Sequence, residues 1–246
     1  MISKIKLTIQ YNGKNFCGWQ SQQKQRSVQQ TLENKISELL NESIKLIATG
    51  RTDAGVHAIM QVAHFETSSN FDLKKLPFAI NDRLDYDVRI LKAEKTKSDF
   101  HSRFSAKQRT YLYRIYCSKV TKPLKNGFAV QIPVSLDVKK MKEAARLFVG
   151  THDFSAFHAA NSSAKTSIRT IYDFKITKSS DEIHFKITGS GFLYKMVRII
   201  VGTLIEIGEG KLLIQDIPKI FESKNRVNAG RTMPPFGLYL CKVKFD

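Results

Sequence analysis

A basic and an acidic side chain lie two residues apart in the segment GRTDAGVH at 50–57. Arg51 and Asp53 are flanked there by Gly50 and Gly55. Glycine permits tight turns and lets a bulky ligand approach the backbone closely. A carboxylate in such a loop can act as a nucleophile or a general base, and a nearby guanidinium can bind an anion or stack on a planar group. On local pattern alone, a turn-forming Asp without a chemical role is the simpler interpretation.

The composition favours a polyanionic partner. Among 246 residues, 40 Lys and Arg stand against 22 Asp and Glu, which leaves a formal net charge of +18. Such an excess concentrates nucleic acid near a protein surface, although a membrane surface or a merely solvated basic face would fit the same composition. The hydrophobic content of 42% is enough for one large or two modest domains.

Several classes of chemistry find no support in the sequence. Cys17, Cys117 and Cys241 are far apart and form no C-x-x-C pair, so neither a disulfide framework nor a zinc site is predicted. The signatures of zinc deaminases, zinc proteases and P-loop proteins are lacking. The N-terminus alternates as a strand, and no apolar run is long enough to cross a bilayer. We therefore expect a cytoplasmic protein without a metal or a membrane partner.

The hydrophobic pattern of the first half predicts the order βαββαβ. Ser27 and Gln30 have the spacing of a capping box at the start of a helix. The predicted elements are a strand at 4–9, that helix, strands at 44–49 and 61–67 on either side of the Asp53 loop, a short helix at Pro77 and a strand at 88–91.

The second half predicts a similar order. Its elements are a strand at 108–117, a helix at 137–149, paired strands at 171–177 and 183–188, helices at 192–207 and 214–221, and a final strand at 238–245. The fold class is therefore α+β, with two ferredoxin-like, RNP-like βαββαβ halves and mainly antiparallel sheets. We predict an N-terminal domain at 1–105, which carries the Asp53 loop, and a C-terminal domain at 106–246. This layout suits RNA-binding sheets but serves many functions.

Motifs along the whole chain resemble one family. The segment GRTDAGVHA at 50–58 resembles the active-site motif of the tRNA pseudouridine synthase A family. Asn12 and Met60 depart from residues that many relatives carry there. Further matching segments are Phe16-x-Gly18-Trp19-Gln20, Arg103-Phe104-Ser105-Ala106, Arg109-x-Tyr111-x-Tyr113, Gly150-x-His152-Asp153-Phe154, Met196-Val197-Arg198-x-x-Val201-Gly202 and Gly237-Leu238-Tyr239-Leu240.

This resemblance implies a pseudouridine synthase fold and an activity. The family converts uridine to pseudouridine at positions 38, 39 and 40 in the anticodon stem-loop of tRNA, without a cofactor, as a homodimer whose subunits jointly hold one tRNA. The base must leave the ribose C1′, rotate and reattach through C5. By resemblance, Asp53 is the catalytic carboxylate. Addition to the sugar, addition to the base and removal of a ribose proton all remain open, and each needs an ionised carboxylate.

The resemblance also implies substrate-binding roles for three residues, each with an alternative. Tyr111 would stack on the extruded uracil, or serve only in cross-strand packing. Arg198 would keep Asp53 ionised, or be a surface or helix-capping charge. Arg51 would fill the gap left by the flipped base or hold a phosphate, or form an ion pair with Asp53.

A non-catalytic RNA-binding module is the alternative function, and a ribosome-associated scaffold is a further one. A module of the RNP type would carry an aromatic RNP signature on a sheet strand, and no segment of this sequence has it. His57 and His152 are expected to be structural hydrogen-bonding residues, because isomerisation by a carboxylate does not require an imidazole.

Overall fold

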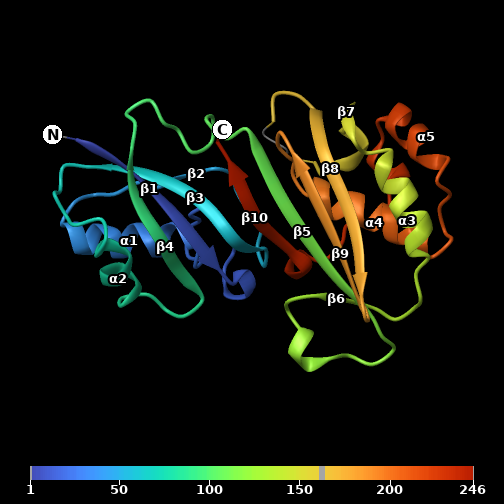
Figure 1. Ribbon diagram of the computed structural model, residues 1–246, viewed down its shortest axis with the longest axis horizontal. Helices are drawn as coiled ribbons and strands as arrows, with labels where there is room; N and C mark the ends of the chain where they lie inside the picture. Colours follow the sequence, from blue (N-terminus) through green and yellow to red (C-terminus); the bar gives the residue numbers. More distant parts are fainter. Residues whose placement is uncertain (1, 161–163, 246) are drawn as a thin grey trace. The chain divides into compact units, whose positions relative to one another are not determined.

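The computed structural model describes residues 2–160 and 164–245, which form two compact units. The first unit runs to Lys107 and also includes the chain from Tyr239, whereas the second spans Gln108–Leu238. Each unit contains β-strands and helices (Figure 1). Within the described residues, no helix is long and apolar enough to cross a membrane.

The first unit has the predicted βαββαβ order. Strand β1 lies in the middle and pairs antiparallel with β3 and β4, while the short β2 pairs with β3. Figure 1 shows α1 and α2 together beside this sheet. The elements are β1 (Ser3–Tyr11), α1 (Val28–Leu40), β2 (Ile47–Ala48), β3 (His57–Thr67), α2 (Leu76–Asn81) and β4 (Val88–Thr96).

The start of α1 follows from its sequence. The side chain of Ser27 accepts a hydrogen bond from the backbone N–H of Gln30, at 3.2 Å, and so caps the helix as predicted. Val28, Leu32 and Ile36 recur at the helical period and are fully buried. The helix holds the C-terminal end of the segment 16–20, and this segment packs against the Asp53 loop.

The second unit is an antiparallel sheet in the order β5-β9-β8-β7, with β6 added parallel to β5. Figure 1 shows α3, α4 and α5 grouped at one side of β8 and β9. The elements are β5 (Gln108–Cys117), β6 (Val130–Ile132), α3 (Val138–Arg146), β7 (Gly150–Asp153), β8 (Ile168–Ser179), β9 (Glu182–Gly189), α4 (Met196–Gly208) and α5 (Asp216–Ser223). The α+β class and the mainly antiparallel pairing are as predicted.

Helix α4 is the core of the second unit and is buried on almost every side. A segment after α5 crosses it at very short range. A Cβ at Gly202 would lie 1.8 Å from the carbonyl oxygen of Arg231, and one at Gly230 would lie 2.5 Å from the Cα of Thr203. Only glycine allows this approach, which places the segment ending at Met233 beside the first turns of α4.

Three predicted boundaries are wrong, each for a local reason. The helix predicted from 192 begins only at Met196, because Lys195 adopts a left-handed conformation with φ 60°. The helix predicted to 149 ends at Arg146, and Gly150 at φ 116° opens β7. The strand predicted at 44–49 is reduced to β2, and the short strands β6 and β7 were not predicted.

The last strand, β10 (Leu238–Lys244), pairs parallel with β3. Tyr239 lies opposite His57 and Leu240 opposite Ala58. The sequence predicted a strand here but assigned it to the C-terminal half, whereas the chain from Tyr239 groups with the first unit. The domains at 1–105 and 106–246 therefore stay a prediction, because a compact grouping is not a test of independent folding.

Candidate active site

The loop that carries Asp53 connects β2 to β3 and is held by main-chain contacts. The backbone N–H of Trp19 donates to the carbonyl oxygen of Thr52 at 3.0 Å, and that of Gly55 donates to Phe16 at 3.4 Å. Asp53 also forms an isolated antiparallel bridge with Gly18. The segment 16–20 thus packs behind the Asp53 loop and supports it.

Two glycines permit this close packing. A Cβ at Gly13 would lie 2.1 Å from the carbonyl oxygen of Val56, and one at Gly18 would lie 2.5 Å from that of Thr52. Gly18 also has φ +113°, which other residues rarely adopt. Gly50, which the sequence singled out, has no such neighbour within 4 Å. The glycines that position Asp53 therefore lie mostly outside its own motif.

Side chains lock the same loop at both ends. The hydroxyls of Tyr11 and Thr52 are hydrogen-bonded at 2.7 Å, and the amide of Gln61 donates to the carbonyl oxygen of Gly50 at 2.9 Å. The backbone N–H of Gly13 donates to His57 Nδ1 at 3.0 Å. His57 is buried, and this bond gives it the structural role expected from the sequence.

Arg51 and Asp53 differ in exposure. Asp53 is half-buried, whereas Arg51 is exposed. The ion pair between Arg51 and Asp53 stays an alternative to the binding role of Arg51. The Arg51 guanidinium lies at the surface, where it can meet a ligand.

Tyr111 and Tyr113 lie on the same face of β5 but in different surroundings. Tyr113 is fully buried and its hydroxyl donates to the carbonyl oxygen of Pro234 at 2.6 Å. Burial raises the pKa of Tyr113 far above its ordinary value. Tyr111 is half-buried and packs edge-on against Phe192, with ring centroids 5.2 Å apart. Ordinary packing therefore describes Tyr113, while Tyr111 keeps part of its ring accessible.

Arg198 lies in the first turn of α4 and is only 9% exposed. Its Nε donates to the carbonyl oxygen of Met233 at 2.7 Å, and the N–H of Met233 donates back to the carbonyl oxygen of Arg198 at 3.2 Å. The alternative of a surface charge is therefore wrong.

The four predicted site residues thus lie in two different units of the chain. Arg51 and Asp53 share one loop of the first unit, and Tyr111 and Arg198 lie on β5 and α4 of the second.

The family model for tRNA pseudouridine synthase matches residues 7–105 and 144–246, which is most of the chain. The chain belongs to the tRNA pseudouridine synthase family. It is an enzyme that isomerises uridine in RNA.

Several relatives of this synthase match it along nearly the full length. The tRNA pseudouridine synthase A of Caldicellulosiruptor bescii is 45% identical over 98% of this chain and 99% of its own. The enzyme of Acetivibrio thermocellus is also 45% identical, with 98% and 99% covered, and that of Bacillus licheniformis is 43% identical, with 99% of both chains covered. The archaeal box H/ACA sRNP Nop10–Cbf5 complex resembles the chain at a TM-score of 0.37 and 10% identity, over 82% of this chain and 43% of that one, which is too weak for any conclusion.

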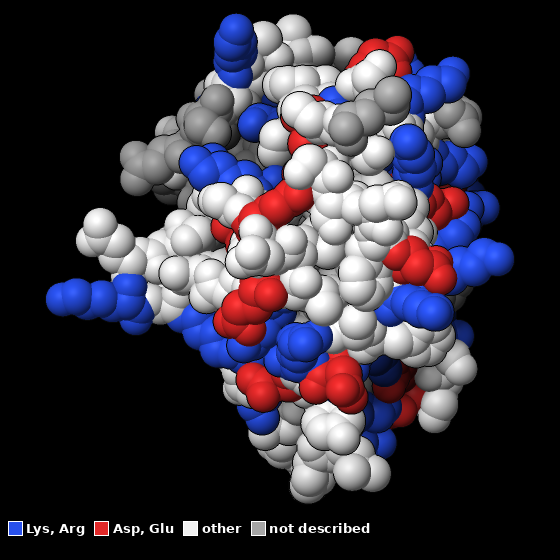
Figure 2. Space-filling view, turned by 90° about the vertical axis from the view of Figure 1, so that its left-hand side faces the viewer, with Lys and Arg blue, Asp and Glu red and all other residues white. Residues whose placement is uncertain are grey.

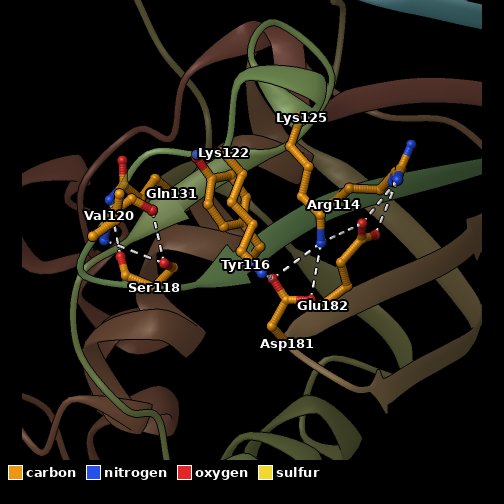
Figure 3. A network of polar contacts seen from close by, with 9 residues as sticks. All are labelled: Arg114, Tyr116, Ser118, Val120, Lys122, Lys125, Gln131, Asp181 and Glu182. Carbon is orange, nitrogen blue, oxygen red and sulfur yellow. Dashed lines mark hydrogen bonds and ion pairs between the residues drawn. The ribbon is translucent and has the colours of Figure 1, made fainter.

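The synthase has two further carboxylates where the chain passes from β8 to β9, Asp181 in the turn and Glu182 at the start of β9 (Figure 3). Asp181 contacts Lys122 at 2.8 Å and Lys125 at 3.0 Å, and these bonds lower its pKa to about 2. Burial raises the pKa of Glu182, but bonds with its basic neighbours, including Lys125 and Arg114, lower it to about 2. Because these cations already occupy the carboxylates, the cluster is structural.

Proposed function

We propose that the synthase converts uridines 38, 39 and 40 in the anticodon stem-loop of tRNA to pseudouridine, with Asp53 as the catalytic carboxylate. The observation that carries this proposal is the placement of Asp53, half-buried in a loop that Gly13 and Gly18 fix through the main chain. The names of the relatives support tRNA as the substrate. The positions within tRNA rest on the family resemblance of the motif at 50–58.

The proposed chemistry asks little of the protein beyond a positioned, ionised carboxylate. The glycosidic bond of the target uridine breaks, the uracil turns within the site, and a new bond forms between C1′ and C5. Attack on the sugar, attack on the base and removal of a ribose proton all use the same carboxylate at one edge of the nucleoside. A loop that is already fixed before binding spends no free energy on reorganisation during the reaction.

Three further residues are assigned to substrate binding. The half-buried ring of Tyr111 stacks on the extruded uracil, and the buried guanidinium of Arg198 supplies positive charge to the site. The exposed Arg51 either fills the space that the flipped base leaves or holds a phosphate. Tyr111→Phe keeps the ring and is expected to lose little activity, whereas Tyr111→Ala is expected to lose much of it. Near-complete loss in Tyr111→Phe would instead assign an essential proton to the phenol.

Mapping of pseudouridine tests the function directly. Wild-type protein and Asp53→Ala are each incubated with an unmodified tRNA transcript, and the product is mapped by carbodiimide-blocked primer extension. We expect stops at positions 38, 39 and 40 with the wild type alone, and tRNA binding by both proteins. Binding without stops in either would instead support the non-catalytic RNA-binding module. Stops produced equally by Asp53→Ala would remove Asp53 from the chemistry.

The proposed enzyme acts as a homodimer in the cytoplasm. The homodimer rests on the family resemblance, and the cytoplasmic location rests on the reducing compartment that the cysteine spacing indicates. Sedimentation velocity of the purified protein, with and without tRNA, distinguishes a dimer from a monomer by mass. A monomer that remains active at the same concentration would overturn the dimer.

A further inference from the structure

A pocket of about 560 Å³ lies in the first unit, and none of its lining residues belongs to the Asp53 loop. Four lysines line it, together with the rings of Phe100 and Phe245, and we call it the lysine pocket. Those lysines are Lys6, Lys97, Lys242 and Lys244. Among the described residues that line it, only Asp99 is acidic. The lining therefore has the charge of an anion-binding site.

Three of these lysines have no carboxylate partner among the described residues. Lys97, Lys242 and Lys244 are exposed and form no ion pair there, whereas Lys6 pairs with Glu94 at 3.3 Å. Ammonium groups gathered around one hollow repel each other, and an anion between them relieves that repulsion.

The lysine pocket is a local feature rather than part of a uniform basic coat. Figure 2 shows one face of the molecule, on which acidic side chains lie between the basic ones and a broad area carries no charge. A net charge of +18 thus does not by itself identify where a polyanion binds. The three lysines of the pocket without a carboxylate partner among the described residues mark a more specific candidate.

An exposed aromatic ring lies next to the pocket in the sequence. Phe104 is 76% exposed, yet one face of its ring stacks on His101, with centroids 4.3 Å apart and planes at 28°. The guanidinium of Arg103 lies 5.9 Å from the same ring. A ring that is supported on one side and open to solvent is the usual platform for stacking of a nucleic-acid base.

The turn that carries Phe104 also forms a wall of the lysine pocket. The N–H of His101 donates to Ser105 Oγ at 3.0 Å, and the N–H of Ser105 donates to the carbonyl oxygen of His101 at 2.8 Å. Nδ1 of His101 accepts from the N–H groups of Arg103 and Phe104. Because Ser105 lines the pocket, the platform and the pocket share one turn.

Buried contacts hold this turn before any ligand binds. The N–H of Ser102 donates to Nδ1 of the buried His64 at 3.2 Å, and burial lowers the pKa of His64 to about 4, so the acceptor is present at neutral pH. Lys4 Nζ donates to the carbonyl oxygens of Ser98 and Phe100, at 2.6 and 3.1 Å. A preformed surface lowers the entropic cost of binding.

We infer that Phe104 and the lysine pocket form a second contact with the tRNA substrate, in which an unpaired base stacks on Phe104 and adjacent phosphates lie among the lysines. The inference rests on the proposed tRNA substrate but not on the role of Asp53. An acidic protein would satisfy the lysines without using the exposed ring, whereas RNA uses both. The contact holds the RNA and takes no part in the chemistry.

A charge-matched pair of variants tests the pocket. One variant replaces Lys97, Lys242 and Lys244 with Ala, and the control replaces Lys45, Lys74 and Lys75, which are exposed, lie in the same unit and form no ion pair with a described residue. The dissociation constant for an unmodified tRNA transcript is measured across a salt series. We expect the pocket variant to lower the slope of log Kd against log salt by about 2 to 3, because each phosphate contact contributes roughly 0.7 to 0.9. An equal change in both variants would overturn the inference.

Phe104 has a matched control in the same unit. Phe78 is 77% exposed and lines a shallow surface with Asp82 and no lysine. Phe104→Leu is expected to raise the Kd for tRNA by about 5- to 150-fold, the range of one base–aromatic stack, whereas Phe104→Tyr and Phe78→Leu bind as the wild type does. If Phe104→Leu bound tRNA with wild-type affinity, no base would stack on Phe104 and the inference would be overturned.

The rate at saturating tRNA separates this inference from the proposed function. Pocket and Phe104 variants are expected to reach the wild-type maximal rate once the RNA is bound, and thermal unfolding shows that they are folded. A loss of maximal rate at unchanged Kd would place the turn in catalysis and overturn the inference. If Asp53 proved dispensable, the differences in tRNA affinity would remain.

Discussion

The Asp53 loop and the Asp181–Glu182 cluster hold their carboxylates by opposite means. In the cluster, side-chain ion pairs to Lys122, Lys125 and Arg114 fix the carboxylates and keep their pKa values at about 2. In the loop, backbone hydrogen bonds and glycine contacts fix the main chain on which Asp53 stands. The cluster is thus fixed through its side chains, whereas the position of Asp53 is fixed through its main chain.

The difference shows which acidic residues a search for an active site should weigh. A strongly lowered pKa marks the cluster and would draw attention there first, yet a carboxylate that several cations occupy has little freedom to react. A carboxylate whose backbone is fixed by distant glycines can be presented to a substrate at a defined position.

Asp53→Asn and Asp181→Asn form the sharpest test of this comparison. We expect Asp53→Asn to lower the rate of pseudouridine formation by at least about 10²- to 10⁴-fold, because the amide cannot act as nucleophile or base. Asp181→Asn is expected to keep the wild-type rate. Both rates are measured with saturating tRNA, and comparable losses in the two variants would show that the cluster is functional.

Gly18→Ala and Gly50→Ala test whether the main chain positions Asp53. A methyl group at position 18 would lie 2.5 Å from the carbonyl oxygen of Thr52, at a φ of +113°, whereas position 50 has open space. We expect Gly18→Ala to lower the free energy of unfolding by about 1–3 kcal/mol and to lower kcat as well. Gly50→Ala should change neither by much, as denaturant unfolding and initial rates would show. Equal effects of the two substitutions on stability and kcat would mean that the packing around Gly18 does not determine the position of the Asp53 loop.

Much of this architecture could be predicted from the sequence. The cap at Ser27, the strand Gln108–Cys117 and the hairpin of β8 and β9 follow from local signals, because caps, alternation and turns act between neighbours in the chain. The predicted end of an element is wrong where one residue adopts an uncommon backbone conformation, as Lys195 does before α4. Such a conformation is imposed by packing and leaves no periodic signal.

The candidate site was harder to predict, because its support is non-local. Asp53 was selected through the motif at 50–58, but spacing alone could not reveal that Gly13 and Gly18 back its loop. The burial of Arg198 depends on the close crossing at Gly202, far along the chain. Phe104 was visible as part of a matching motif, yet its exposure and the lysine pocket that its turn helps to line appear only in three dimensions.

An acid titration addresses the cluster itself. Because the pKa of Glu182 is lowered from about 4.5 to about 2 in the folded state, its ionised form stabilises the fold above the ordinary pKa, and this contribution is lost as pH falls through about 2. We expect Glu182→Gln to be less stable at neutral pH and to lose less stability between about pH 5 and 2 than the wild type. Urea unfolding at each pH measures this, with the exposed Glu222→Gln as the control. An unchanged pH dependence would show that Glu182 is not held as the distances indicate.

Lys122→Ala and Lys125→Ala are expected to give the smallest effects, and together they compare how much each lysine of the cluster contributes to stability. The Lys122 side chain is 46% exposed and pairs with Asp181, whereas that of Lys125 is 21% exposed and pairs with both Asp181 and Glu182. An exposed ion pair contributes about 0 to 1 kcal/mol, so Lys122→Ala should shift the unfolding midpoint barely, and Lys125→Ala should shift it more. Neither should change the rate of pseudouridine formation at saturating tRNA. If Lys122→Ala slowed catalysis while leaving stability intact, the cluster would take part in the reaction as Asp53 does, and the contrast between a structural cluster and a catalytic loop would fail.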